Sequence, residues 1–177
     1  MSFMFKGTSD AFTGEITDTN GVRKHIGNWD TSSVNDMNSM FYGAAAFNLA
    51  DISSWNTASV TDMGTMFRSA SGFNQDISGW DVSSVRNMAD MFHNALAYNS
   101  PLFGGWDTRS VTSMARMFAR TAYSDATSST TQTWNTASVK DFTYMFEGSG
   151  GFTAAISQWD TSSATTMEAM FKNASSF

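Results

Sequence analysis

Hydrophobic residues recur along the whole chain in one pattern that restarts at each tryptophan. After every tryptophan come, with few exceptions, an Asp or Asn, small and hydroxyl-bearing residues, a Val, a Met and a Met-Phe pair, and then a small residue and an aromatic one. The tryptophans, which follow one another at steps of 25 to 28 residues, are Trp29, Trp55, Trp80, Trp106, Trp134 and Trp159. A repeat of this length is typical of solenoids, in which stacking of successive units supplies the core that one unit cannot form alone.

The half of each repeat that follows the tryptophan has the spacing of a short helix. In the second copy, the apolar side chains from Val60 to Ala70 fall within an arc of about 120°, counting roughly 100° per residue, whereas a strand would turn half of them to solvent. Ser59 and Asp62 are placed to cap the first turn, because a hydroxyl and a carboxylate can accept its free N–H groups. The spacing therefore predicts one short helix or helical turn per coil. The remaining apolar residues predict a short strand near Ile77 that pairs in parallel with its equivalents.

The Met-Phe pair indicates the number of coils. It occurs seven times, at positions 4–5, 40–41, 66–67, 91–92, 117–118, 145–146 and 170–171. This predicts an α/β repeat fold, a solenoid of about seven coils of 25–26 residues. At the strand spacing of about 4.8 Å, seven coils make a rod about 34 Å long in which equivalent tryptophan, methionine and phenylalanine side chains form ladders. A β-helix-like solenoid is the alternative architecture.

The repeat is interrupted in places that do not divide the chain, so residues 1–177 are expected to form a single domain. Additional residues near 13–25 flank Asn20-Gly21, which predicts a hairpin-like insertion. A smaller irregularity at 98–103 contains the one proline of the chain, Pro101. A polar loop is expected near 124–133, where Ser124 and Thr131 stand in columns that elsewhere hold Phe and Ile. Such insertions often carry function in solenoids.

Composition excludes several classes of function. The chain of 177 residues has a formal net charge of -6, which disfavours binding to duplex nucleic acid, because contacts with phosphates need a basic face. It contains no cysteine, which excludes disulfides, thiolate nucleophiles and cysteine-ligated metals. Its apolar runs are far shorter than the roughly 20 residues of a membrane helix, and no secretion signal or anchor is recognised.

One run of the sequence resembles a known family. Residues 73–88, FNQDISGWDVSSVRNM, followed by Met91-Phe92, are similar to the repeat of the BspA-like leucine-rich-repeat surface proteins, a microbial repeat domain of unknown function that is abundant in mycoplasma lipoproteins. The similarity covers nearly the whole chain. It implies a right-handed leucine-rich-repeat-like solenoid, a cell-surface or extracellular location, and a role in adhesion or partner binding. It brings no catalytic residues.

Three patterns in the sequence are candidates for catalysis or ligand binding. His25 and His93 have no spacing that indicates catalysis or a metal site. A column of Asp and Asn beginning at Asp30 could hold calcium between coils, but the exchange of Asp for Asn favours Asx turns that accept backbone N–H groups. A threonine column beginning at Thr31 could bind ice or carbohydrate, although turn chemistry already explains it. We therefore expect no enzyme activity, no cofactor and no metal.

Solvent-facing positions that vary within the constant frame are the better candidates for binding. The slot after the Met-Phe pair contributes Tyr42, Arg68 and His93, and a local basic group contributes Arg109, Arg116 and Arg120. These residues are expected to bind a protein or glycan partner on a cell or matrix surface, without nucleic acid and without membrane insertion. The alternative function is self-assembly, in which the chain stacks end to end into a dimer or filament.

Overall fold

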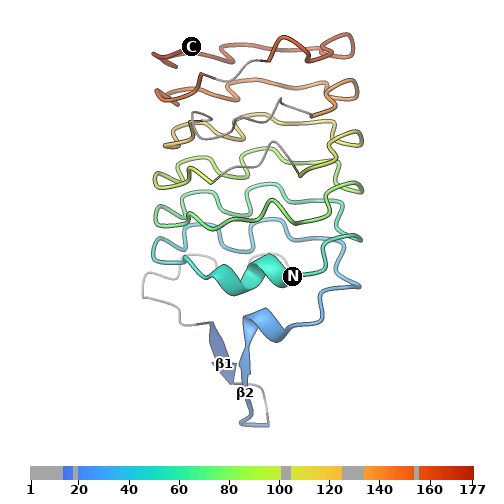
Figure 1. Cartoon of the computed structure of the whole chain (residues 1–177), viewed down its shortest axis with the longest axis vertical. Coiled ribbons are helices and arrows are strands. Elements are labelled where there is room, and N and C mark those ends of the chain that lie inside the picture. The colour runs from blue at the N-terminus through green and yellow to red at the C-terminus, as the bar shows by residue number, and fades with distance from the viewer. Residues whose placement is uncertain (1–13, 18–19, 101–104, 125–133, 154–155) are drawn as a thin grey trace.

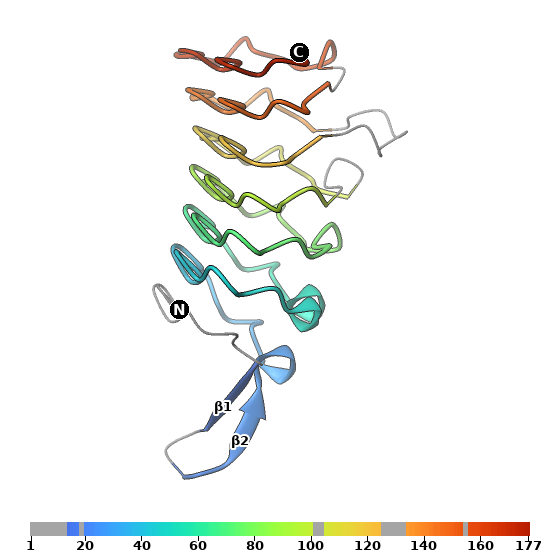
Figure 2. The ribbon, with the colours of Figure 1, turned by 90° about the vertical axis from the view of Figure 1, so that its left-hand side faces the viewer.

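The computed structural model describes residues 14–17, 20–100, 105–124, 134–153 and 156–177. The chain winds into coils that lie one above another in a single file, with the C-terminal coil at one end and a small hairpin projecting from the other (Figure 1, Figure 2). The regular elements of the described residues are the strands β1 (Glu15–Thr17) and β2 (Arg23–His25) and the 3-10 helices η1 (Ile26–Asn28) and η2 (Ala50–Ser54).

The hairpin lies within the range where the sequence predicts an insertion. β1 and β2 pair antiparallel, with Glu15 opposite His25 and Thr17 opposite Arg23. An exposed ion pair between Arg23 and Glu15, at 3.4 Å, links the two strands. The polar loop expected near 124–133 falls, beyond Ser124, outside the described residues.

Each coil contains a segment of consecutive turns, which we call the turn ribbon. Hydrogen bonds between the ribbons of neighbouring coils connect the coils. The six described ribbons are residues 36–44, 62–70, 87–95, 113–121, 141–149 and 166–174. Within the second ribbon, alternate N–H groups bond in two ways. Those of Met63, Thr65, Phe67 and Ser69 donate to carbonyls of the next coil, and those of Met66, Arg68 and Ala70 donate to the carbonyl three residues earlier. Single parallel bridges such as Asp62 to Asn87 connect all six ribbons.

Of the short helix or helical turn predicted for each coil, the helix is absent over 60–70, where the structure has consecutive turns. Thr65 and Ser69 have positive φ angles of 55° and 58°, which interrupt a right-handed helix every fourth residue. The turns that result place Met63, Met66 and Phe67 toward the core, so they reproduce the three- and four-residue spacing of a helix without its hydrogen bonds. The Ser59 hydroxyl caps no helix and donates instead to the carbonyl of Ser32 in the preceding coil.

The expected strand near Ile77 is also absent, because residues 73–77 have no regular structure. The equivalent residue of the preceding coil, Ile52, lies in η2. Bridging between coils therefore occurs in the half of the repeat where a helix was predicted. In the half where a strand was predicted, the 3-10 helices η1 and η2 occur in the first two described coils.

The positive φ angles of the ribbon give a test of its conformation. Gly148 has a φ of 68°, and a Cβ built on it would lie 3.4 Å from Cγ of Arg120. Gly148→Ala is therefore expected to lower the free energy of unfolding by about 1 kcal/mol, because a left-handed conformation is strained for residues with a Cβ. The measurement is urea unfolding followed by tryptophan fluorescence. The control is Gly79→Ala, where the added Cβ meets no atom within 4 Å. Equal loss in both variants would contradict the assigned conformation.

The core is built from columns of like side chains, as the repeat predicts. The rings of the Met-Phe phenylalanines are stacked through six coils at centroid distances of 5.4 to 5.7 Å: Phe41, Phe67, Phe92, Phe118, Phe146 and Phe171. A second aromatic residue lies beside each of them within its coil, as Phe73 does beside Phe67 at 3.9 Å. Indoles of neighbouring coils stack as well, for example Trp55 on Trp80 at 6.4 Å. Burying each such ring contributes about 2–3 kcal/mol.

Polar side chains connect the coils around this core. The buried indole N–H of Trp80 donates to the carbonyl of Ile52, one coil earlier. The amide oxygen of Asn48 accepts the N–H of Asn74, and that of Asn74 accepts the N–H of Asn99. Because each bond satisfies a backbone group of the neighbouring coil, these columns hold the coils in register. The surface positions between them are thereby fixed relative to one another.

Candidate functional site

Three residues from three successive ribbons converge on the carboxylate of Asp90, and with it they form a group that we call the Asp90 cluster: Arg68, Asp90, His93 and Arg116. Arg116 donates Nε to Oδ1 of Asp90 at 2.9 Å and Nη2 to Oδ2 at 3.0 Å. Arg68 donates Nη1 to Oδ1 at 3.2 Å, and Nδ1 of His93 lies 2.9 Å from the same oxygen. Since an ionised carboxylate only accepts hydrogen bonds, His93 must carry its proton on Nδ1 here.

The cluster is held by the carboxylate at its centre. The side chain of Asp90 is 7% exposed, whereas those of Arg68 and Arg116 are 32% and 41% exposed. Burial alone would raise the pKa of Asp90. Hydrogen bonds from His93 and Arg116, with the charges of Arg116 and Arg68, outweigh burial and lower that pKa from 3.8 to about 2. Asp90 is therefore ionised at neutral pH and fixes the direction of two guanidinium groups.

Aromatic and charged side chains extend this surface along the ribbons. The guanidinium carbon of Arg68 lies 5.8 Å from the ring centroid of Tyr42. Four coils further on, the ammonium of Lys172 lies 5.5 Å from the ring centroid of Tyr144 and 3.4 Å from Oε1 of Glu147. Cation–ring contacts of this kind are worth about 0.5–1 kcal/mol at exposed sites. At two places, four coils apart, this surface thus pairs an aromatic ring with a cation of the next coil.

The structure brings together some of the site residues that the sequence predicts. Tyr42, Arg68, His93 and Arg116 lie in one connected group through the contacts above. Arg120 follows in the same ribbon as Arg116, is exposed, and has no ion pair within the part of the chain that the structure describes.

Arg109 does not extend the basic group expected with Arg116 and Arg120. It pairs instead with Asp107 two residues earlier, at 2.8 Å. This ion pair lies in the turn after Trp106, where Asp107 belongs to the column of Asp and Asn residues that follow each tryptophan. Arg109 is therefore bound to a partner of its own and not to the Asp90 cluster.

Asp90, at the centre of the candidate site, was missed by reasoning from the sequence. The residue before the Met-Phe pair of each ribbon is otherwise Ser39, Thr65, Arg116, Tyr144 or Ala169. The available signal was a carboxylate in this column with an arginine one repeat away on each side, at Arg68 and Arg116. It could not be used without knowing that residues one repeat apart lie side by side in the ribbons.

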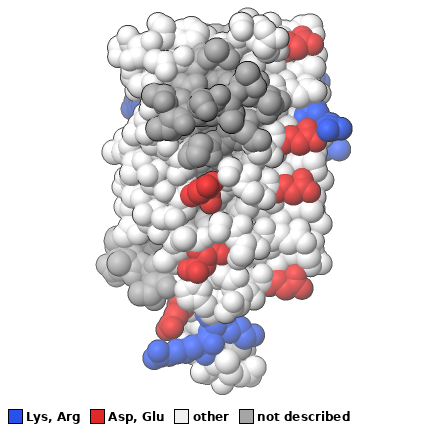
Figure 3. Space-filling view, in the orientation of Figure 1, with Lys and Arg blue, Asp and Glu red and all other residues white. Residues whose placement is uncertain are grey.

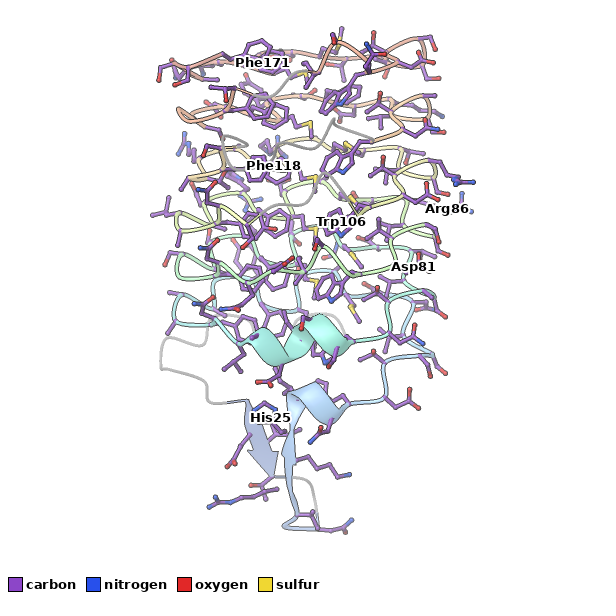
Figure 4. The ribbon with its side chains drawn as sticks, viewed as in Figure 1. His25, Asp81, Arg86, Trp106, Phe118 and Phe171 are labelled. Carbon is purple, nitrogen blue, oxygen red and sulfur yellow. The ribbon has the colours of Figure 1, made fainter. Side chains whose placement is uncertain are left out.

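The column of Asp and Asn after each tryptophan forms Asx turns. The side-chain oxygen of Asp81 accepts the N–H and the hydroxyl of Ser83, and Asn56 accepts the N–H of Ala58. Hydrogen bonds from Ser83 lower the pKa of Asp81. Figure 3 shows acidic side chains spaced along the edge where Figure 4 places Asp81. Within the described ranges no group of three or more His, Asp or Glu residues is arranged to hold a metal ion.

The threonine column does not form a surface. Thr57 and Thr108 are buried, and their hydroxyls donate to the carbonyls of Asp81 and Asn135 in the following coil. Thr31 and Thr136 make the equivalent bonds. The suggestion that this column binds ice or carbohydrate is therefore wrong, because its hydroxyls are used to connect the coils.

A cavity of about 330 Å³ lies beside η1 and η2, lined in part by His25, Asp51 and Ser53. Nε2 of His25 lies 3.7 Å from Oδ2 of Asp51, and Nδ1 accepts the N–H of Gly27. A nucleophilic serine would need the ring nitrogen that does not face the carboxylate. Here that nitrogen is already bonded to the backbone of Gly27. The pair is therefore not arranged for nucleophilic catalysis.

Comparison with known proteins gives one family. The family model described as "Mycoplasma protein of unknown function, DUF285" matches residues 1–130 and, in a second overlapping alignment, residues 103–177. Neither a curated protein nor a solved structure matches the chain. Among the described residues, no helix is long and apolar enough to cross a membrane.

Proposed function

The chain belongs to the Mycoplasma protein family of unknown function DUF285, and on this premise we propose that it is a non-enzymatic binding module. In this proposal it is a right-handed solenoid of the BspA-like leucine-rich-repeat type, displayed at a cell surface, that attaches to a protein or glycan. Affinity comes from many weak contacts made at once by side chains that the stacked coils hold at fixed intervals.

The observation that carries the proposal is the contrast between a constant backbone and a variable slot. All six described ribbons have left-handed residues at corresponding places, and bonds between ribbons repeat from coil to coil. The slot after the Met-Phe pair nevertheless differs in every ribbon: Tyr42, Arg68, His93, Ala119, Glu147 and Lys172. Ala119 is buried, whereas the other five residues are partly or fully exposed, so in five of the six ribbons this variation is available for recognition of a partner.

The test is binding of the purified full chain to arrays of immobilised glycans and extracellular proteins. A variant that combines Tyr42→Ala, Arg68→Ala and Lys172→Ala should bind the ligand that is found at least tenfold more weakly. A control with Ser59→Ala, Arg109→Ala and Lys140→Ala, which changes exposed residues outside this slot, should bind it as the unchanged chain does. Absence of any ligand on the arrays, or equal binding by both variants, would contradict the proposal.

Self-assembly is the second candidate, and the last coil favours it. The side chains of Met167 and Phe177 are 50% and 56% exposed there. Phe177 also stacks on Phe171 at 3.9 Å. Sedimentation velocity of the full chain should then show species larger than a monomer that disappear in a Met167→Lys, Phe177→Lys variant. A monomer at all concentrations would reject this candidate.

A further inference from the structure

The ribbons in the middle of the stack differ in charge from those on either side. The first residue of the ribbon is aspartate in three coils, Asp36, Asp62 and Asp141, and neutral in the other three, Asn87, Ser113 and Thr166. In ribbons 87–95 and 113–121 the charged side chains are Asp90, Arg116 and Arg120, which leaves one net positive charge. A chain with a net charge of -6 therefore has a local surplus of positive charge here. Asp141 and Glu147 of the following ribbon also act on Arg116 through their charge.

The contacts within the Asp90 cluster leave donors free for a ligand. The carboxylate of Asp90 accepts hydrogen bonds from Nε and Nη2 of Arg116 but only from Nη1 of Arg68. The remaining N–H groups of both guanidiniums lie on partly exposed side chains. Asp90 thus acts as an internal anchor that fixes the orientation of the arginines before any ligand arrives, which reduces the entropy lost on binding.

The order of these groups along the stack matches a linear anion. Arg68 lies one coil before Asp90, and Arg116 and Arg120 lie one coil after it, so the cations follow one another in the direction in which the coils are stacked (Figure 2). With coils about 4.8 Å apart, Arg68 and Arg116 start about 10 Å from each other. Tyr42, on which Arg68 is placed, adds an aromatic ring one coil earlier. Flat rings next to cations are suited to a chain of sugars that carries acidic groups.

We infer that the Asp90 cluster, extended by Tyr42 and Arg120, is a binding site for an acidic polysaccharide, a polymer of sugars with sulfate or carboxylate groups. Guanidinium groups bind sulfate and carboxylate through paired hydrogen bonds, for which their planar shape is suited. The inference rests on the proposed binding function and specifies its ligand class. Because the chain has a net charge of -6, attachment depends on local groups of cations such as this one and weakens as salt screens the charges.

The experiment uses the full chain and dextran sulfate, with uncharged dextran and poly-glutamate as comparison probes. Binding is followed by the fluorescence anisotropy of labelled polymer at increasing salt. The test variant is Arg68→Gln with Arg120→Gln. It should keep its fold, because Arg116 and His93 still pair with Asp90 and Arg120 has no ion pair in the described structure. Arg109→Gln is the matched control, an exposed arginine bound to Asp107 in a different turn.

The unchanged chain should bind dextran sulfate, with weaker binding at higher salt, and should not bind dextran. The double variant should bind about tenfold more weakly, and the Arg109→Gln control should bind within twofold of the unchanged chain. Equal binding of poly-glutamate would overturn the inference in favour of an acidic protein. Failure to bind dextran sulfate, or equal loss in the control, would also overturn it. If the inference fails but the arrays identify another ligand, the proposed binding function still holds. The inference and the proposed function can therefore fail separately.

Discussion

Replacing Phe118 by alanine is expected to lower the free energy of unfolding by about 4 kcal/mol, because it removes a fully buried ring from the centre of the aromatic columns. The ring of Phe118 stacks on Phe92 at 5.6 Å, on Phe146 at 5.7 Å and on Tyr123 at 4.5 Å. Each coil contacts only its neighbours, so a cavity at this level weakens the interface on both sides. In the variant, the coils before Phe118 and the coils after it should therefore unfold in separate transitions.

The measurement is unfolding in urea followed by both fluorescence and circular dichroism. The unchanged chain should give one transition in both signals, and Phe118→Ala should give an earlier and broader one. Phe177→Ala is the matched control, since this ring is 56% exposed. Its loss is expected to cost less than about 1 kcal/mol. A change at Phe118 as small as that at Phe177 would show that the columns do not hold the coils together.

Asp90→Asn is expected to lower the free energy of unfolding by about 2 kcal/mol at neutral pH, because it removes the acceptor charge between Arg68 and Arg116. Asparagine is the informative substitution. Asp90 has a φ of 57°, and asparagine adopts this left-handed conformation nearly as readily as aspartate. The variant therefore isolates the loss of charge from any strain of the backbone. Asp90→Ala would combine both effects and should be less stable.

The contribution of Asp90 has a defined dependence on pH. Its pKa is lower in the folded protein, at about 2, than the ordinary 3.8 of the unfolded chain. A group of this kind stabilises the folded state above its unfolded pKa, and the contribution is lost as the pH falls toward the folded value. The difference in stability between the unchanged chain and Asp90→Asn should be constant near neutrality and shrink between about pH 4 and pH 2. A difference that does not change with pH would contradict the assigned role.

The columns of like residues were predictable from the sequence, and the conformation between them was not. Tryptophan and Met-Phe recur at nearly constant steps, so the stacking of Trp55 on Trp80 and of Phe67 on Phe92 follows from the repeat alone. The ribbon could not be recognised because it has the same apolar spacing as a helix. What excludes the helix is the left-handed conformation of residues such as Thr65 and Arg116, which are not residue types that favour it.

The candidate site was predictable only in part. The variable slot indicated Tyr42, Arg68 and His93 as exposed residues in one column, because they differ while the frame is constant. The contact between Arg68 and Arg116 through a shared carboxylate needs the positions of three coils in space. The sequence distance between them, 48 residues, carries no signal of it. Arg109 was grouped with Arg116 because the two are close in sequence, although each has a different acidic partner.

The central claim is that ribbons one repeat apart lie side by side and share backbone hydrogen bonds, and nuclear Overhauser contacts in solution test it most directly. Amide protons of Met63, Thr65 and Phe67 should show contacts with residues 87–91 of the following coil, because each donates to a carbonyl there. Contacts of Val60 to Ala70 with residues four positions further along the same segment, and none with residues 87–91, would identify a helix and contradict the account.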